Sequence, residues 1–240
     1  MIPIAKIASE FGEIVVSKDS ASGAVRYDQG RIHQSEADAR GVSLVAYIHA
    51  VYDLLLQAGC RDVLMIGCGG GTLATMLHGA GVRVTIADVD SRAFHLARQY
   101  FNLPAEIACH AMDGAAFLQS STRWYDGIVL DAYAGDRLPP QFATPAFLRL
   151  VRRRLSRPAG VFIANIHVLD DGDSAARCYA EQMSAVWPEA RLLDSPGRKK
   201  RNALVLAGAV ATLDGASLRI APAIGADEIA AELAALLLQK

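Results

Sequence analysis

A glycine-rich turn directly after a short apolar segment is the feature that most constrains the fold of this chain. The segment Asp62–Ile66 reads DVLMI, and Gly-Cys-Gly-Gly-Gly-Thr follows it at positions 67–72. An apolar run before such a turn and a helical pattern after it are typical of a buried strand, and the glycines allow a ligand to approach the main chain closely. A tight strand–helix turn without a ligand is the alternative interpretation.

Strand and helix patterns alternate along the rest of the chain. The predicted strands are 62–66, 82–87, 105–109, 127–130 and 160–166, with 191–193 and 203–207 as a closing antiparallel pair. The predicted helices are 36–57, 72–78, 91–101, 115–119, 144–155, 175–187 and 227–239. This alternation predicts an α/β fold with a mostly parallel sheet and helices on both faces. Ligands of such sheets bind beyond the carboxyl ends of the strands, so the residues there are the candidates for function.

The first 35 residues have a different pattern. Apolar segments at 14–16 and 25–27 are separated by a Ser/Asp/Gly turn, which predicts a small N-terminal β-hairpin unit over residues 1–35. The α/β domain is then expected over residues 36–240. A length of 240 residues, with 52% hydrophobic and 20% charged residues, suits one such domain with a small appendage.

Charge and cysteine content restrict the classes of partner. The net charge is −1, from 24 Lys+Arg and 25 Asp+Glu, so no global basic field favours nucleic-acid binding. The basic run at 198–201 is expected to be a solvated hairpin tip, with contact to an anionic partner as the alternative. The four cysteines show neither CxxC nor zinc-ligand spacing, so no metal site is predicted. Acidic residues near the N-terminus and short apolar runs predict a cytoplasmic protein without a membrane segment.

Acidic residues follow the next two predicted strands. Asp88 ends the second strand, where a carboxylate accepts hydrogen bonds from ribose hydroxyls, while Asp90 can instead begin the next helix. Asp113 and Gly114 follow the third strand, where Asp113 can accept a bond from adenine N6 or cap a helix. Thr72 stands where a dinucleotide motif has its third glycine. These features predict an adenosine site without a pyrophosphate grip, which favours an S-adenosyl cofactor over NAD.

Polar side chains also follow the fourth and fifth strands. Asp131 directly follows the fourth strand, and it is the candidate for accepting a proton from an attacking amine or for holding a cationic substrate. Tyr133 and Asp136 lie in the same loop, and an ordinary loop-capping role for Asp131 is the alternative. After the fifth strand come Asn165 and His167, of which His167 is either a base or a hydrogen-bonded surface residue.

Several linked motifs resemble the polyamine aminopropyltransferases (spermidine synthases), in particular the divergent spermidine-synthase-like proteins. The similar segments are YDQGRIHQSEAD, VLMIGCGGGTLA, ADVD, HAMDGAAFL, YDGIVLDAY and LPPQFATPAFL, roughly from 27 to 166. The resemblance implies a class I methyltransferase-like Rossmann sheet and Asp131 as the catalytic carboxylate. The cofactor-contacting residues that it implies are Gln34, Gly67, Gly69, Gly71, Asp88, Asp113 and Gly114. His49 matches a family histidine and, with Tyr133 and Asp136, is a candidate for substrate contact.

The chain departs from the family where a cationic amine is bound. The family's glycine motif includes an aspartate close to the aminopropyl amine, and the matching residue here is Gly70. The Tyr-His-Glu that helps to hold the diamine falls on Ser-Leu-Val at 43–45, and a second loop aspartate falls on Ala134. A polyamine site needs acids to offset the desolvation of ammonium groups, so these three losses are physically significant.

Three functions follow from these observations. The resemblance implies aminopropyl transfer from decarboxylated S-adenosylmethionine to a polyamine, with a small-molecule amine as partner. Methyl transfer from S-adenosylmethionine is the second, because the absence of an acid at Gly70 suits a cofactor that keeps its carboxylate. The third is a cofactor-binding module that has lost its acceptor site and its activity. Family members commonly dimerise, and the hairpin edges leave a homodimer open.

Overall fold

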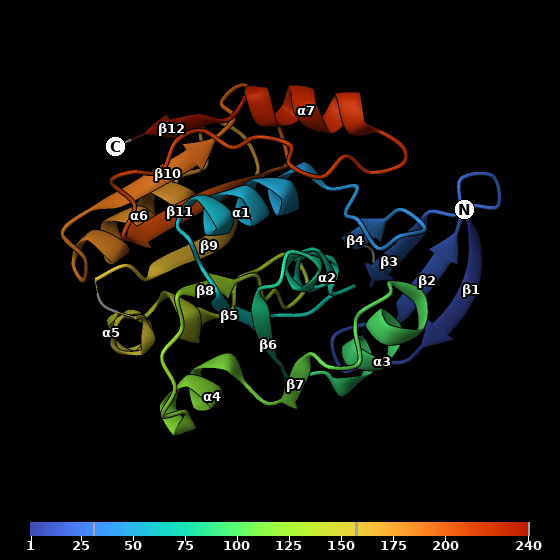
Figure 1. Cartoon of the computed structure of the whole chain (residues 1–240), viewed down its shortest axis with the longest axis horizontal. Helices are drawn as coiled ribbons and strands as arrows, with labels where there is room; N and C mark the ends of the chain where they lie inside the picture. Colours follow the sequence, from blue (N-terminus) through green and yellow to red (C-terminus); the bar gives the residue numbers. More distant parts are fainter. Residues whose placement is uncertain (31, 157, 240) are drawn as a thin grey trace.

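The N-terminal segment of the computed structural model, which describes residues 1–30, 32–156 and 158–239, forms an antiparallel sheet of its own (Figure 1). Its strands lie in the order β1 (Ile2–Ile7), β2 (Ile14–Lys18), β3 (Val25–Gln29) and β4 (Ile32–Ala37). The predicted hairpin corresponds to β2 and β3, and the structure adds a strand on each side. β4 is mostly polar, so it lacks the apolar alternation that marks a strand, whereas β1 reads IPIAKI and its mostly exposed residues are not predicted as a strand.

The second sheet has eight strands among the described residues, in the order β12-β10-β11-β9-β8-β5-β6-β7. They are β5 (Asp62–Ile66), β6 (Arg83–Asp88), β7 (Ala108–Ala111), β8 (Gly127–Leu130), β9 (Val161–Val168), β10 (Ala190–Asp194), β11 (Arg201–Gly208) and β12 (Leu237–Gln239). Strands β5 to β9 pair in parallel, whereas β11 is antiparallel to both β9 and β10. The predicted α/β fold, with its closing antiparallel pair, is confirmed.

Helices cover both faces of this sheet. They are α1 (Ala46–Gln57), α2 (Thr72–Gly79), α3 (Ser91–Tyr100), α4 (Gly114–Ser120), α5 (Pro145–Arg154), α6 (Ala175–Ser184) and α7 (Ala226–Ala234), with a 3-10 turn at η1 (Pro140–Ala143). Residues of α1, α2, α3 and α7 share one apolar cluster with the sheet, and residues of α4, α5 and α6 share another. Figure 1 shows α7 lying over α1 on the first of these faces.

Two predicted helices are much longer than the observed ones. The helix predicted over 36–57 begins only at α1, because Asp38 accepts hydrogen bonds from the backbone N–H groups of Arg40 and Val42 and fixes a loop there. The helix predicted over 227–239 ends at Ala234, and the chain then pairs as β12 with the edge strand β10. In the second case, pairing with an exposed sheet edge overrides local helix propensity.

The N-terminal sheet packs against α3 and the segment that follows it. Ile14, Val16 and Tyr27 share an apolar cluster with Leu96 and Phe101. The rings of Tyr27 and Phe101 meet edge to face with their centroids 6.4 Å apart. This packing fixes the N-terminal sheet next to the carboxyl ends of the parallel strands.

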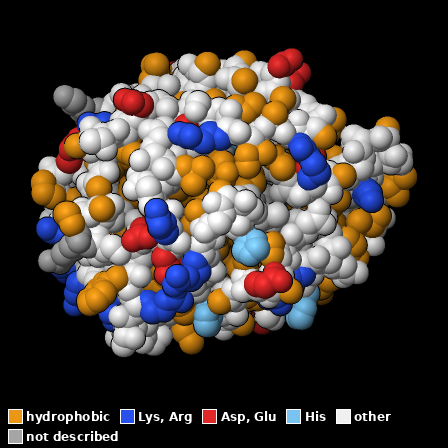
Figure 2. Space-filling model, in the orientation of Figure 1, with side chains coloured by type: hydrophobic (Ala, Val, Ile, Leu, Met, Phe, Trp, Pro, Cys, Tyr) orange, Lys and Arg blue, Asp and Glu red, His pale blue; other side chains and the backbone are white. Residues whose placement is uncertain are grey.

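The surface carries mixed charge, as the net charge of −1 implies. On the face shown in Figure 2, Lys and Arg side chains lie in small groups, with Asp or Glu beside several of them. Within the described ranges, no helix has the length and apolar character needed to cross a membrane.

Candidate active site

A first cavity of about 230 Å³ lies at the carboxyl ends of β5, β6 and β8. It contains most of the residues predicted for cofactor and substrate, namely Gln34, Gly67, Gly69, Asp88, Asp113, Gly114, Asp131 and Tyr133. The N-terminal sheet closes one side of it with Tyr27 and Gln29, and η1 contributes Gln141 and Phe142. All four lie in segments that resemble the aminopropyltransferases, but no residue pattern singled them out, because only the tertiary structure brings these segments to the cavity.

The glycine turn lets two loops approach each other closely. Gly67 has φ +102°, and a Cβ built on it would lie 2.1 Å from the carbonyl oxygen of Asp131. No other residue fits there, so this glycine fixes the distance between the β5 and β8 loops. Gly71 also has a positive φ, of +67°, but it does not line the cavity and instead precedes α2 against Leu103. Its role in this structure is to begin a helix.

Asp88 and Asp90 have separate roles. The two carboxylate oxygens of Asp88 accept hydrogen bonds from the backbone N–H groups of Cys68 and Asp90, each at 2.8 Å. Burial raises the pKa of Asp88 above its ordinary value. Asp90 caps α3 by accepting from Arg92 N at 3.0 Å and also accepts from the Ser9 hydroxyl. Because Asp90 is committed to the cap, the remaining lone pairs of Asp88 are those available to a ligand.

Asp113 is both a helix cap and part of the cavity wall. Its Oδ1 accepts hydrogen bonds from the N–H groups of Ala115 and Ala116 at 3.0 Å, which stabilises the start of α4. Its Oδ2 accepts from the Gln141 side chain at 3.3 Å. Both interpretations of this residue therefore fit the structure, because one oxygen caps the helix and the other borders the cavity.

A second cavity, of about 100 Å³, adjoins the first. The two share Gln34, Cys68, Gly69, Asp131 and Tyr133, so Asp131 lies at their junction. Tyr47 donates a hydrogen bond to Asp131 Oδ2 at 2.9 Å, and Asn165 Nδ2 donates to Oδ1 at 2.8 Å. These two donors hold the carboxylate in one orientation.

His167 and Tyr133 form the wall beside Asp131. Their rings stack with centroids 3.9 Å apart, and the Tyr133 hydroxyl donates to the Asn165 carbonyl and accepts from the His167 N–H. Burial lowers the pKa of His167, while Asp131 and Asp136 oppose this effect. Burial, and then Asp131, raise the pKa of Tyr47 well above its ordinary value, so its hydroxyl keeps the proton that it donates.

Two residues predicted to contact substrate lie outside both cavities. His49 is fully buried in α1, and its Nε2 bonds to the Ser43 carbonyl at 2.7 Å. The Asp136 side chain is 81% exposed and lies 4.0 Å from Arg137 in the surface loop. The residue of α1 that bonds to Asp131 is Tyr47 instead, and Ile48 lines the second cavity beside it. Tyr47 does not belong to the apolar face that the sequence predicts for this helix, so no pattern indicated its role.

Other side chains fill the space beside Gly70, the position in the glycine turn at which the resemblance implies an aspartate. Gly70 is buried, and a Cβ built on it would lie 2.9 Å from Phe101 Cδ1 and 3.0 Å from Ser35 Cβ. The N–H of Gly70 donates to the Ser35 hydroxyl at 2.9 Å. Gly70 lines neither cavity, so a packed contact lies where the resemblance implies an acid.

Comparison with known sequences confirms the resemblance to the aminopropyltransferases. A probable polyamine aminopropyl transferase of Bifidobacterium longum is 31% identical over 138 residues, which are 57% of this chain and 31% of that protein. An eEF1A lysine and N-terminal methyltransferase homolog of Drosophila pseudoobscura is 30% identical over 123 residues, which are 46% of this chain and 18% of that protein. The chain thus spans less than a third of these relatives. No protein-family model matches it.

Solved structures share the fold. A probable spermidine synthase of Corynebacterium glutamicum aligns with a TM-score of 0.79 and 19% identity, over 98% of this chain and 90% of that chain. A spermidine synthase in complex with the transition state analogue AdoDATO gives 0.66 at 19% identity, over 89% and 76%. Human methyltransferase-like protein 13 in complex with SAH gives 0.55 at 23% identity, over 78% and 88%. By name, these relatives and neighbours are transferases.

Proposed function

We propose that this protein transfers an alkyl group from an S-adenosyl sulfonium to an amine nitrogen, with the aminopropyl group as the first candidate. The observation that carries this proposal is the position of Asp131. Its carboxylate lies at the junction of two cavities and is oriented by donors on both oxygens. One cavity is then available to the donor molecule and the other to the acceptor.

The first cavity fits the nucleoside part of such a donor. Asp88 offers a carboxylate to ribose hydroxyls, Asp113 offers one near the adenine edge, and the glycine turn lets the ligand approach the main chain. Support also comes from the neighbours, of which one was solved with AdoDATO and another with SAH. No group of three or more His, Cys, Asp or Glu in the described part of the chain is placed to bind a metal ion.

The protein's share of the chemistry is positioning and proton acceptance. A bound sulfonium supplies an electrophilic carbon and a neutral thioether as leaving group. Asp131 holds the amine so that the nitrogen lone pair forms the new C–N bond as the C–S bond breaks, and it accepts the proton that the nitrogen releases. Tyr47 and Asn165 keep the carboxylate aimed at the junction, which lowers the entropy cost of alignment.

Methyl transfer is the second candidate, and a specific observation favours it. Decarboxylated S-adenosylmethionine carries an ammonium that needs a nearby acid, whereas S-adenosylmethionine carries a carboxylate as well. At Gly70 the chain has no acid, and Phe101 and Ser35 occupy the space in which one would lie. The transferred group therefore has to be decided by experiment.

Calorimetry with S-adenosylmethionine and its decarboxylated form, in parallel, tests the proposal. We expect nucleoside binding, and tighter binding of the decarboxylated form if the aminopropyl group is transferred. Binding of the carboxylate-bearing form more tightly by about tenfold would exclude aminopropyl transfer and leave methyl transfer. Asp131→Asn is expected to lower turnover by about 100-fold while nucleoside binding is kept. Failure of both nucleosides to bind, or full turnover in Asp131→Asn, would contradict the proposal.

A further inference from the structure

A third cavity, of about 210 Å³, opens beside the second cavity. The two share Val45, Tyr47 and Asn202. Tyr47 therefore has the Asp131 cavity on one side and this third cavity on the other. The rest of the lining comes mainly from the basic run 198–201 and from the first turn of α1. The third cavity is therefore adjacent to the cavity that contains Asp131, with the Tyr47 side chain in the wall between them.

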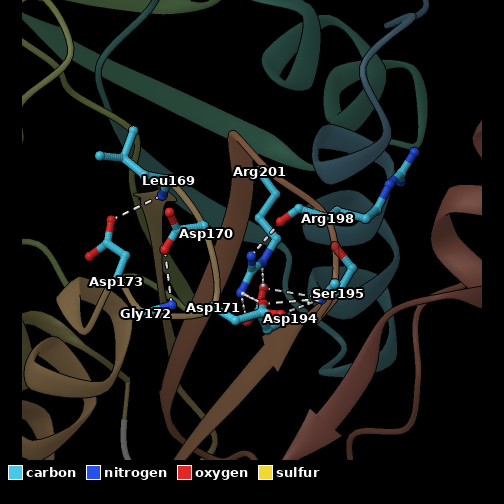
Figure 3. A network of polar contacts seen from close by, with 10 residues as sticks. Leu169, Asp170, Asp171, Gly172, Asp173, Asp194, Ser195, Arg198 and Arg201 are labelled. Carbon is cyan, nitrogen blue, oxygen red and sulfur yellow. Dashed lines mark hydrogen bonds and ion pairs between the residues drawn. The ribbon is translucent and has the colours of Figure 1, made fainter.

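One arginine of the basic run fixes the loop in place. The Arg201 side chain is 8% exposed and pairs with Asp194 at 2.7 Å and with Asp171 at 3.1 Å (Figure 3). The N–H of Gly197 also donates to Asp171, at 3.0 Å. The Arg198 side chain points away from these acids in Figure 3 and pairs with Glu232. The expectation of a purely solvated hairpin tip is therefore corrected for Arg201, which is held in an ion-pair network.

The two lysines of the run are the cations that remain available. Lys199 and Lys200 are exposed, and neither has an ion-pair partner among residues 1–30, 32–156 and 158–239. Lys200 has φ +50°, and its N–H donates to the Leu169 carbonyl at 2.9 Å, so the backbone there is held in the left-handed region. Among the described residues that line the third cavity, the one acid is Glu232, and Arg198 already pairs with it. The field in the third cavity is therefore positive.

Neutral groups of the wall also favour an anion. Val45 precedes α1 without a side-chain cap, and no acidic residue lies in the first turn of this 12-residue helix, so no acidic side chain of that turn offsets the positive end of its dipole beside the cavity. The Asn202 amide lies between the second and third cavities, and its Oδ1 has no hydrogen-bond partner in the part of the chain that the structure describes. That orphaned oxygen is an acceptor, so this amide favours an anion only in the orientation with its O and NH₂ exchanged, in which the NH₂ donates to the ligand.

We propose that the acceptor is a small amine with an anionic group, a carboxylate or a phosphate, which the third cavity binds while the nitrogen reaches Asp131. This inference rests on the proposed function, because it takes the second cavity as the acceptor site. An unsubstituted diamine fits less well, since its far ammonium would lie beside Lys199 and Lys200 with no free carboxylate near it.

Three amines of equal chain length provide the test: 4-aminobutanoate, butylamine and 1,4-diaminobutane, with 3-aminopropyl phosphate as a phosphate arm. Their binding is measured by calorimetry on the protein loaded with S-adenosylhomocysteine, and turnover is measured separately. We expect an anionic amine to bind about tenfold more tightly than the diamine, with butylamine between them. The carboxylate and phosphate arms then show which anion is preferred.

A pair of double variants separates the local effect from total charge. Lys199→Gln with Lys200→Asn removes both free cations, and Asn tolerates the positive φ at position 200. Arg149→Gln with Arg153→Gln removes the same charge from exposed positions of α5, which lines none of the three cavities. We expect the lysine variant to weaken binding of the anionic amine about fivefold and the control to change it less than about twofold.

The outcomes keep the two proposals apart. Lysine-dependent binding of an anionic amine without turnover would contradict the proposed function and support the third cavity as an anion site. If S-adenosylhomocysteine does not bind, the same comparison on the unloaded protein decides the inference. Preference for the diamine, equal effects of the two double variants, or binding of an acidic peptide with none of the small amines would overturn it.

Discussion

Replacing Gly70 by aspartate tests whether the fold has room for the acid that the resemblance to the aminopropyltransferases implies at this position. A Cβ at this position would lie 2.9 Å from Phe101 Cδ1 and 3.0 Å from both Phe101 Cε1 and Ser35 Cβ. Phe101 is only 1% exposed and packs against Tyr27, so it has little room to move. The φ angle of Gly70 is not positive, so the backbone itself does not oppose a side chain. The whole cost of Gly70→Asp therefore comes from crowding and from a buried carboxylate.

The magnitude follows from these two terms. Overpacking a core costs about 1–3 kcal/mol, and burying a polar group without a partner costs about 1–3 kcal/mol more. We expect a loss of about 4 kcal/mol in the free energy of unfolding, which lowers Tm by about 12 °C in a chain of this size. Thermal unfolding followed by circular dichroism measures it. Gly70→Ala is the matched control, and it is expected to cost about 1–2 kcal/mol because it adds the Cβ alone.

A double-mutant cycle links the effect to Phe101. Phe101→Leu removes the ring atoms that a residue 70 side chain would meet, so Gly70→Asp is expected to cost about 1 kcal/mol less in that background. The reasoning would be refuted if Gly70→Asp unfolded at the wild-type temperature and bound decarboxylated S-adenosylmethionine more than about tenfold more tightly. In that case the aspartate would have room in the folded protein and would pair with the ammonium of the ligand.

Three further predictions concern the site and its surroundings. Tyr47→Phe removes one donor to the Asp131 carboxylate and is expected to lower kcat about tenfold in steady-state assays, with nucleoside affinity in calorimetry unchanged. Asp88→Asn is expected to weaken nucleoside binding about tenfold. Burial raises the pKa of Asp88, so the wild-type affinity is expected to begin to fall on acidification at a pH above the ordinary range of an aspartate. The affinity of the variant is expected to fall less. Burial lowers the pKa of His49 below about 6.5. The stability that this histidine contributes is therefore present above that pH and is lost as the pH falls through its folded-state pKa. In denaturant unfolding, the stability of His49→Gln is expected to depend less on pH in this window.

The sequence could predict the part of the site that follows the strands. Asp88 ends β6, Asp113 lies two residues after β7 and Asp131 directly follows β8, and the carboxyl ends of parallel strands meet at one edge of the sheet. That rule needs only the order of the elements, and it places all three carboxylates on one cavity. The glycine turn also follows a strand of this sheet. Gly67 is needed there because its lack of a side chain lets the main chain of Asp131 pass close to it.

The sequence could not predict which side chain of α1 reaches the site. Tyr47 and His49 are two residues apart, so they point to nearly opposite sides of the helix. The apolar pattern placed His49 on the buried face, and the structure agrees, yet the family resemblance assigned it to the substrate. Both residues lie inside the predicted and the observed helix, so the packing of α1 against its neighbours decides between them, while the loop fixed by Asp38 moves the start of that helix from 36 to 46. Such a loop depends on contacts with Ala223, far away in the sequence.

The charges of the acceptor region connect the departures from the related enzymes with the basic run. Each ammonium of a bound polyamine needs a nearby acid to offset its desolvation, and Asp131 is the one carboxylate among the described residues of the second cavity. Burial lowers the pKa of both His33 and His167, so neither adds a positive charge near neutral pH. The site can therefore neutralise the reacting amine and no second ammonium. If the acids had been lost without any gain, a neutral acceptor would suffice. Because the adjoining cavity carries the two free lysines at 199–200, the pattern favours an acceptor whose far end carries negative charge.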